Sequence, residues 1–394
     1  MLNRRAALLA AAAAMTATIA WGPGPAAAAD PVKIGLILPM SGPFASTGRQ
    51  IEAAARLYIQ QHGAEVAGRP VELIVRDDTG TADLTKRLAQ ELVVNDRVAV
   101  LAGFGLTPLA LSAAPIATQA KVPQVVMAAA TATITEASPF IVRTSFTLPQ
   151  ATVPMAQWAA GNGMKKVVTL VSDYGPGIDA EKAFTDEFTA AGGTVDNLRV
   201  PLRNPDFSPF LQRVADAGPD ALFVFVPSGV GAQFMKQFTE RGLARSGIRL
   251  IGPGDVTDDD LLNDMGDVAL DVVTSQHYSA AHDSPGNKSF VEAFKAANRG
   301  MRPNFMAVGG YDGMHLIYEA LKTTGGASDG PALVEAMKGM AWESPRGPVS
   351  IDPETRDIVQ NIYIRKVERV NGELYNVEFE TIPAVKDPVK AAKK

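Results

Sequence analysis

Small and hydroxyl-bearing residues follow two apolar runs in the first third of the chain. Gly103-Phe104-Gly105-Leu106-Thr107 comes directly after Val98–Ala102, and Ala129-Ala130-Thr131-Ala132-Thr133 comes directly after Val125–Ala128. Small side chains let a ligand approach the backbone, and threonine hydroxyls both donate and accept hydrogen bonds. If the two runs are parallel strands, both loops lie at the sheet edge where open α/β sheets bind ligands, and a helix start adds N–H groups suited to a carboxylate. The spacing therefore predicts a binding site for a small carboxylate.

Catalytic and metal chemistry is poorly represented. No G-x-S-x-G elbow and no H-E-x-x-H motif occurs, and the four histidines form no motif. His277 and His282 are five residues apart, which is weak support for a zinc pair. The third glycine of a dinucleotide fingerprint falls on Pro108, so an NAD-dependent oxidoreductase is a minor alternative. We expect no catalytic residue, no metal and no cofactor.

Apolar runs alternate with helical patterns, which is typical of parallel strands covered by helices on both faces. The expected strands are Val32–Pro39, Val71–Val75, Val98–Ala102, Val125–Ala128, Ile141–Thr144, Val167–Val171, Ala221–Val226, Leu250–Ile251 and Val272–Thr274. Helices are expected over 51–59, 84–95, 108–121, 148–163, 180–191, 207–217, 232–241, 288–298 and 308–323, with a short one after Gly330. Repeated β-α-β units predict doubly wound α/β sheets.

Four short motifs predict local structure. Thr47 and Gln50 have the spacing of a capping box, and Asn371-Gly372 marks a tight hairpin. Asp258-Asp259-Asp260 is typical of the exposed first turn of a helix, where negative charge is favoured. Lysines at 386, 390, 393 and 394 predict a solvated basic tail.

The alternation pauses twice, which divides the chain into two α/β lobes joined by a three-segment hinge. Residues 30–146 and 280–360 are assigned to the N-terminal lobe, 147–279 and 361–385 to the C-terminal lobe, and 386–394 to a basic tail. Two lobes joined by several strands form a hinge, and the cleft between them is the expected ligand site.

The first 29 residues have the three parts of a secretory signal peptide. Arg4 and Arg5 precede the uncharged run Ala6–Ala20, and small residues lead to a predicted cleavage after Ala29. The paired arginines leave the twin-arginine route as an alternative. The chain has no cysteine, which excludes disulfides and a lipid-modified cysteine, and its net charge of −5 does not suggest nucleic-acid binding. We expect a periplasmic monomer without a membrane anchor.

Six short motifs, taken in their order and spacing, make the mature chain resemble the branched-chain amino acid type of periplasmic substrate-binding protein, the receptor component of ABC importers. These motifs are Ile34-Gly35-Leu36 with Pro39-Met40-Ser41-Gly42-Pro43, Arg76-Asp77-Asp78, the Thr107 loop, Ala129-Ala130-Thr131, Ser172-Asp173-Tyr174-Gly175, and Gly252-Pro253 before Asp255. The resemblance implies the type I periplasmic binding protein architecture. It also implies closure around one ligand and transient docking on a membrane permease. A sensory receptor of the same fold is the first alternative.

The resemblance also assigns ligand contacts. Thr107 and Thr131 match positions that bind a carboxylate, and the carbonyl of Ala129 matches one that helps hold an ammonium. Thr47, Tyr174, Pro227 and Ser228 match other contacts. Phe104 and Tyr174 are candidates for contact with an aromatic ring. The full predicted set is Thr47, Phe104, Gly105, Leu106, Thr107, Ala129, Ala130, Thr131, Tyr174, Pro227, Ser228 and Asp255.

One position departs from the pattern implied by the resemblance. Relatives that bind amino acids carry an acidic residue directly after Gly252-Pro253, whereas this chain has Gly254 there and Asp255 one residue later. Either Asp255 pairs with a ligand ammonium, or the ligand has no amine. An unpaired buried carboxylate is costly, so its absence suits an amine-free acid. The sequence leaves branched-chain or other amino acids and aromatic or 2-oxo acids open, with a slight preference for the acids.

Overall fold

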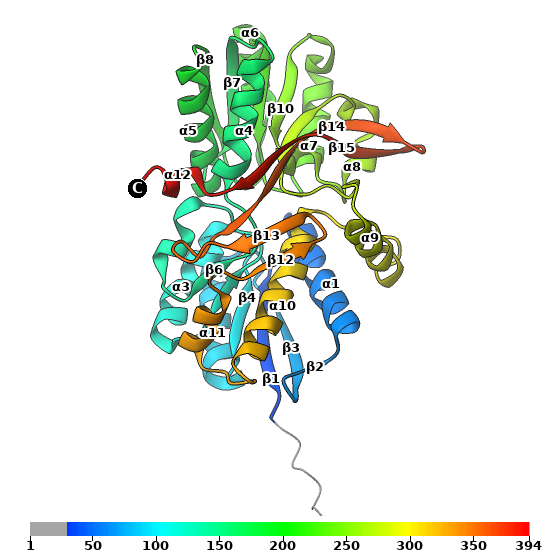
Figure 1. Ribbon diagram of the computed structural model, residues 1–394. Helices are drawn as coiled ribbons and strands as arrows, with labels where there is room; N and C mark the ends of the chain where they lie inside the picture. The colour runs from blue at the N-terminus through cyan, green and yellow to red at the C-terminus, as the bar shows by residue number, and fades with distance from the viewer. Residues whose placement is uncertain (1–29, 394) are drawn as a thin grey trace, which may run out of the picture.

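The computed structural model describes residues 30–393, so the predicted signal peptide, its cleavage and the last lysine lie outside the described residues. Two sheets, one above the other in Figure 1, form the centres of two α/β lobes. The first sheet has the order β2-β3-β1-β4-β5-β6. Its strands are β1 (Val32–Leu38), β2 (Glu65–Val66), β3 (Arg69–Asp77), β4 (Val100–Gly103), β5 (Gln124–Val126) and β6 (Ile141–Arg143).

The second sheet has the order β12-β13-β14-β11-β10-β9-β7-β8, and β15 pairs with β14. Its strands are β7 (Lys166–Ser172), β8 (Thr194–Val200), β9 (Ala221–Phe225), β10 (Arg249–Pro253), β11 (Val273–Gln276), β12 (Ala341–Ser344), β13 (Gly347–Ile351), β14 (Ile358–Val370) and β15 (Glu373–Val385).

Helices cover both sheets (Figure 1). The helices of the first half are α1 (Ala45–His62), α2 (Ala82–Glu91), α3 (Thr107–Ala120), α4 (Leu148–Gly161), α5 (Gly175–Ala190) and α6 (Ser208–Ala217). Those of the second half are α7 (Gly231–Glu240), α8 (Leu262–Met265), α9 (Pro285–Ala297), α10 (Phe305–Thr323), α11 (Gly330–Met337) and α12 (Pro388–Ala391). Within residues 30–393, no helix combines the length and apolar character needed to cross a membrane.

Both sheets contain a parallel block with the same winding. The first block is β3-β1-β4-β5-β6 and the second is β8-β7-β9-β10-β11. The direction of winding therefore reverses between β1 and β4 in one sheet and between β7 and β9 in the other. Ligands of open α/β sheets bind at the carboxyl ends of the strands beside such a switch point. The two α/β sheets and their alternation confirm the predicted fold class.

Three segments connect the lobes. The chain leaves the first sheet after β6, returns between β11 and α9, and crosses again along β14. Arg356, just before β14, donates from Nε to the Ile141 carbonyl at 3.0 Å, whereas Lys366 near its other end pairs with Val273 of β11. The lobe boundaries given above remain our proposed division of the chain.

The hairpin prediction is confirmed, because Val370 pairs with Glu373 and both Asn371 and Gly372 have positive φ. The capping box at Thr47 is wrong. Helix α1 already begins at Ala45, and Gln50 instead donates from Nε2 to the Arg302 carbonyl at 2.9 Å. Strand β8 was not predicted, because this edge strand buries only the side chains at 198 and 200.

Two predictions of solvent exposure are also wrong. Asp258 and Asp259 are buried, because Asn304 and Asn376 donate hydrogen bonds to them from distant parts of the chain. Lys390 of the predicted solvated tail is buried in α12, where Nζ lies 2.5 Å from the Asp357 carboxylate. In each case a long-range partner, which the local sequence does not show, compensates for burying the charge.

Candidate functional site

A cavity lies between the lobes, where the carboxyl ends of the parallel strands of both sheets face each other. It is adjacent to both switch points: Gly105 and Thr107 follow β4, and Tyr174 and Ser228 follow β7 and β9. The residues that line it are Thr47, Gly105, Leu106, Thr107, Ala128, Ala129, Ala130, Phe146, Leu148, Tyr174, Pro176, Phe225, Pro227, Ser228, Asp255 and Met306. The position agrees with the general rule for ligand sites in such sheets.

One end of the cavity is suited to an anion. Helix α3 of the first lobe begins at Thr107 and helix α5 of the second lobe begins at Gly175. The two starts lie close together, because a Cβ placed on Gly175 would lie 3.5 Å from Thr107 Cγ2, and it would lie 2.5 Å from Thr131 Oγ1. Thr107 Oγ1 and Thr131 Oγ1 share a hydrogen bond of 2.9 Å. First-turn N–H groups lack intrahelical partners and the helix dipole favours negative charge, so this end can bind a carboxylate.

A fully buried arginine supports this end from behind. Arg143 on β6 donates from Nη2 to the Thr131 carbonyl at 2.7 Å and from Nη1 to the Phe146 carbonyl at 3.1 Å. Its Nε lies 3.1 Å from Oδ1 of Asp357. Arg143 thus fixes the backbone on two sides of the cavity. Arg143 was not among the predicted site residues, because it lies inside the predicted strand Ile141–Thr144.

The second lobe supplies polar groups at other strand ends. Ser228 and Asp255 follow β9 and β10, and both are buried. Ser228 Oγ makes no hydrogen bond in the structure. Burial, followed by the neighbouring carboxyl of Asp258, raises the pKa of Asp255 to about 8. Asp255 is therefore largely protonated at neutral pH in the closed cleft and can both donate and accept hydrogen bonds.

Apolar side chains make up much of the lining of the cavity. Phe146, Leu148, Phe225 and Met306 line it together with the ring of Tyr174. The Tyr174 and Phe225 rings are nearly parallel, with 13° between their planes and 6.1 Å between their centroids. Flat apolar walls of this kind accommodate an aromatic ring. Phe146, Leu148, Phe225 and Met306 were not among the predicted site residues, although Phe225 lies near the end of the predicted strand Ala221–Val226.

Most of the predicted site residues are brought together. Ten of them line the cavity: Thr47, Gly105, Leu106, Thr107, Ala129, Ala130, Tyr174, Pro227, Ser228 and Asp255. Thr131 lies behind Thr107, to which it is hydrogen-bonded. Phe104 does not line the cavity: its φ of 67° is left-handed, and its buried side chain belongs to a hydrophobic cluster of the first lobe. Ligand contact by the other residues stays a prediction.

Gly254 cannot carry a side chain in this structure. A Cβ there would lie 2.0 Å from Nη2 of Arg365 and 2.9 Å from Cβ of Gln276. Arg365 on β14 is fully buried, donates to the Tyr278 carbonyl and lies 3.8 Å from the Asp259 carboxylate. A cation thus occupies the space beside Gly254. This charge disfavours a ligand ammonium near that strand end.

Contacts between the lobes hold the cleft closed. Asn304 Nδ2, at the start of α10, donates to Asp258 Oδ1 at 2.8 Å, and Ser46 Oγ on α1 donates to Asp260 Oδ2 at 2.9 Å. On the far side of the cavity, the Ala132 N–H donates to Asp179 Oδ2 on α5 at 2.8 Å. The structure is therefore a closed form.

Closure should weaken as the pH rises. Burial, followed by Asp260, raises the pKa of Asp258 to about 7, and that of Asp255 is about 8. Opening hydrates both carboxyls and returns each pKa toward its ordinary value of 3.8. The closed form then binds more protons, so closure is undiminished below about pH 4 and weakens progressively up to about pH 8.

Small-angle scattering of the ligand-free protein should show a larger radius of gyration at about pH 9 than at about pH 5. Asp255→Asn with Asp258→Asn should remove the difference, and a difference that persists contradicts the assignment.

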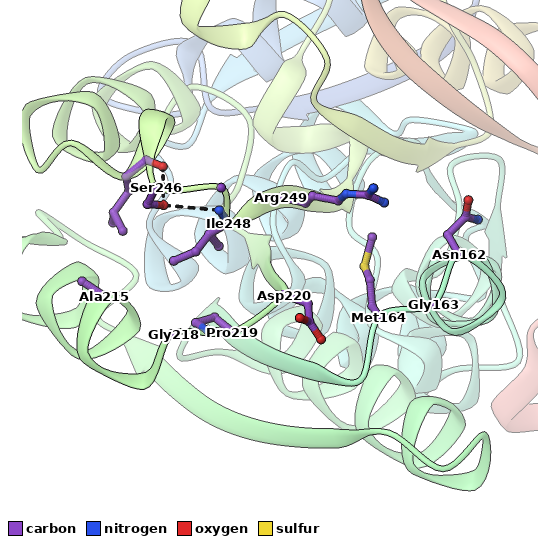
Figure 2. Close-up of a pocket in the computed structure, with 12 residues that line it drawn as sticks. Asn162, Gly163, Met164, Ala215, Gly218, Pro219, Asp220, Ser246, Ile248 and Arg249 are labelled. Atoms are coloured by element: carbon purple, nitrogen blue, oxygen red, sulfur yellow. Dashed lines mark hydrogen bonds between the residues drawn. The ribbon is translucent and has the colours of Figure 1, made fainter.

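A second, larger cavity lies at the opposite end of the C-terminal lobe (Figure 2). It is formed by the segments that precede β7, β9 and β10, including Met164, Asp220 and Arg249. The Asp220 carboxylate already accepts hydrogen bonds from the N–H groups of Lys165 and Lys166, at 2.7 and 2.9 Å. These are the amino ends of the strands, and ligands of such sheets bind at the other end.

The two histidines considered for zinc have other contacts. His277 is buried against Phe146, and His282 Nδ1 lies 2.7 Å from Glu378 Oε2. Across residues 30–393, no group of three or more histidine, aspartate or glutamate side chains is placed to hold a metal ion.

Comparison with known proteins identifies relatives along most of the chain. A model of the family described as periplasmic binding protein matches residues 31–373. Leu/Ile/Val-binding protein homolog 6 of Brucella melitensis biotype 1 is 50% identical over 369 residues, which cover 92% of this chain and 94% of that protein.

Two solved structures are similar along nearly their whole length. The solute-binding protein of an ABC transporter from Rhodopseudomonas palustris BisB5, in complex with 3,4-dihydroxybenzoic acid, is 66% identical with a TM-score of 0.90, covering 91% of this chain and 99% of its own. Its counterpart from Rhodopseudomonas palustris HaA2, in complex with p-hydroxybenzoic acid, is 44% identical with a TM-score of 0.89. The match covers 93% of this chain and 100% of that protein.

Proposed function

Because this chain belongs to the periplasmic binding protein family, we propose that it is the periplasmic receptor of an ABC importer for an aromatic carboxylate, a hydroxybenzoate in particular. The observation that carries the proposal is that the cleft has an anion-binding end, an apolar lining and a second polar end. The relatives in complex with 3,4-dihydroxybenzoic acid and p-hydroxybenzoic acid support the same ligand class.

The separation of the two polar ends favours a rigid ligand. The Thr107–Thr131 pair contacts Gly175 after β7, whereas Asp255 follows β10, two strands away in the sheet. Neighbouring strands are about 4.8 Å apart, so the two ends are separated by about 10 Å. A hydroxybenzoate carries its carboxylate and its hydroxyl on opposite sides of a flat ring. It can therefore reach both ends while the ring lies beside Tyr174 and Phe225.

A branched-chain amino acid is the second candidate, and the Brucella relative's name favours it. Its ammonium and carboxylate sit on one carbon atom, so they cannot reach both polar ends. Gly254 leaves no space for an acidic side chain beside Arg365, and Asp255 is largely neutral in the closed cleft at pH 7. These features favour the aromatic acid.

Binding is coupled to transport through closure. The ligand carboxylate binds first to the N-terminal lobe. The C-terminal lobe then closes, and Tyr174, Ser228 and Asp255 contact the ligand ring and its substituents. Ligand shifts the population toward the closed form by its differential affinity for that form. The closed pair of lobes is the surface that a permease recognises; a signalling protein is the alternative recipient.

A thermal-shift panel on residues 30–394, unfolded and refolded to remove carried-over ligand, tests the ligand class. 4-Hydroxybenzoate and 3,4-dihydroxybenzoate at about 100 times their Kd should stabilise the protein by about 2.7 kcal/mol, a shift of a few degrees. Leucine, isoleucine and valine should give no shift. Stabilisation by the amino acids alone would replace this proposal with the second candidate.

A further inference from the structure

We propose that Ser228 and Asp255 recognise two adjacent ring hydroxyls of the ligand, so that the cleft is selective for vicinal dihydroxybenzoates over monohydroxy and unsubstituted benzoates. This inference rests on the proposed function and assigns the specificity of that same cleft. The starts of α3 and α5 are the anion-binding end of the cavity, so they take the ligand carboxylate and leave Ser228 and Asp255 for the ring hydroxyls.

Ser228 has a buried hydroxyl that lacks a hydrogen-bond partner. Its side chain is 1% exposed, it lines the cavity, and Oγ forms no hydrogen bond of ordinary geometry. Asp258, whose pKa the nearby Ser228 hydroxyl lowers, can accept a hydrogen bond from that hydroxyl. The Oγ lone pairs are then free to accept from the ligand.

Asp255 lies one strand further from the anion-binding end. Ser228 follows β9 and Asp255 follows β10, and these strands are hydrogen-bonded neighbours. Their ends are about 4.8 Å apart, a spacing that adjacent substituents on one ring can span. Gln276 Nε2 approaches one Asp255 oxygen at 3.5 Å, which is the limit of a weak hydrogen bond. The carboxyl therefore retains capacity for a ligand hydroxyl.

The order of the strands assigns each hydroxyl. With the carboxylate at Gly175, beyond β7, the next strand end along the sheet carries Ser228 and the one after it carries Asp255. The ring position nearer the carboxylate is the 3-position and the farther one is the 4-position. Ser228 thus recognises the 3-hydroxyl and Asp255 the 4-hydroxyl.

Calorimetric titration of the wild-type protein, Ser228→Ala and Asp255→Ala with benzoate, 3-hydroxybenzoate, 4-hydroxybenzoate and 3,4-dihydroxybenzoate tests the assignment. Ser228→Ala should raise Kd about tenfold for the two ligands with a 3-hydroxyl and leave the other two within about twofold. Asp255→Ala should do the same for the two ligands with a 4-hydroxyl. Ser246→Ala, which removes a hydroxyl at the opposite end of the C-terminal lobe, is the control and should leave the affinities for all four ligands unchanged.

The outcomes separate the two proposals. If the wild-type protein binds none of the four acids, the proposed function fails and the inference fails with it. If the acids bind but Ser228→Ala weakens all four by one factor, or none, recognition of the 3-hydroxyl is wrong while the proposed function stands. Circular dichroism and the Tm of each variant show whether it is folded, and a folded Asp255→Ala keeps the test informative if Ser228→Ala does not fold.

Discussion

Replacing Arg143 with methionine should lower the free energy of unfolding by about 3 kcal/mol and weaken benzoate binding at least tenfold. The substitution removes a fully buried guanidinium that lies 3.1 Å from the Asp357 carboxylate. It also leaves the Thr131 and Phe146 carbonyls without their donors. The loss falls at the low end of the range for a broken buried pair, because Lys390 still contacts Asp357 at 2.5 Å.

Arg199→Met is the matched control for Arg143. Arg199 also pairs with a carboxylate, Glu181, at 2.7 Å, but its side chain is 43% exposed. Exposed pairs contribute about 0–1 kcal/mol, so this variant should stay within that range and bind ligand normally. Urea denaturation gives the stabilities and calorimetry the affinities. Equal losses of unfolding free energy in the two variants would show that the buried Arg143–Asp357 pair contributes no more than an exposed ion pair.

Sequence patterns predicted the elements that depend on local order. Strands β1, β4, β7 and β9 are runs of apolar residues buried on both faces, and such runs carry their own signal. The two ligand loops were found for the same reason, since a strand end is a local feature. The placement of Thr107 and Ser228 at one cavity followed from these strand ends and from the resemblance together.

The predictions that failed involve partners far away in the chain. Asp258 appeared exposed because Asn304, which binds it, lies 46 residues away. Arg143 ends a short apolar strand and Arg365 lies on a strand of mixed polarity, and the roles of both depend on distant partners, Asp357 and Asp259. Phe104 packs in a core cluster instead of lining the cavity, and its positive φ is a backbone state that no neighbouring residue type signals. Polar groups in the core need three-dimensional partners, which a pattern of local hydrophobicity does not contain.

Gly175→Ala should raise Kd for the ligand about 10- to 100-fold without lowering the stability of either lobe. A Cβ at this position would lie 2.5 Å from Thr131 Oγ1 and 3.5 Å from Thr107 Cγ2, both in the other lobe. The added methyl group thus opposes closure alone, and overpacking of this kind costs about 1–3 kcal/mol. The open form has no such contact. Calorimetry measures Kd, and small-angle scattering with saturating ligand shows whether the lobes still close.

Gly286→Ala is the matched control for this change. Gly286 also lies in the first turn of a helix, α9, and a Cβ there would meet no atom within 4 Å. This variant should bind like the wild-type protein. Because the Gly175 contact exists only when the starts of α3 and α5 meet, wild-type affinity in Gly175→Ala would show that they do not meet in the bound state. The carboxylate would then be held by the N-terminal lobe alone, and the second helix dipole would contribute nothing to its binding.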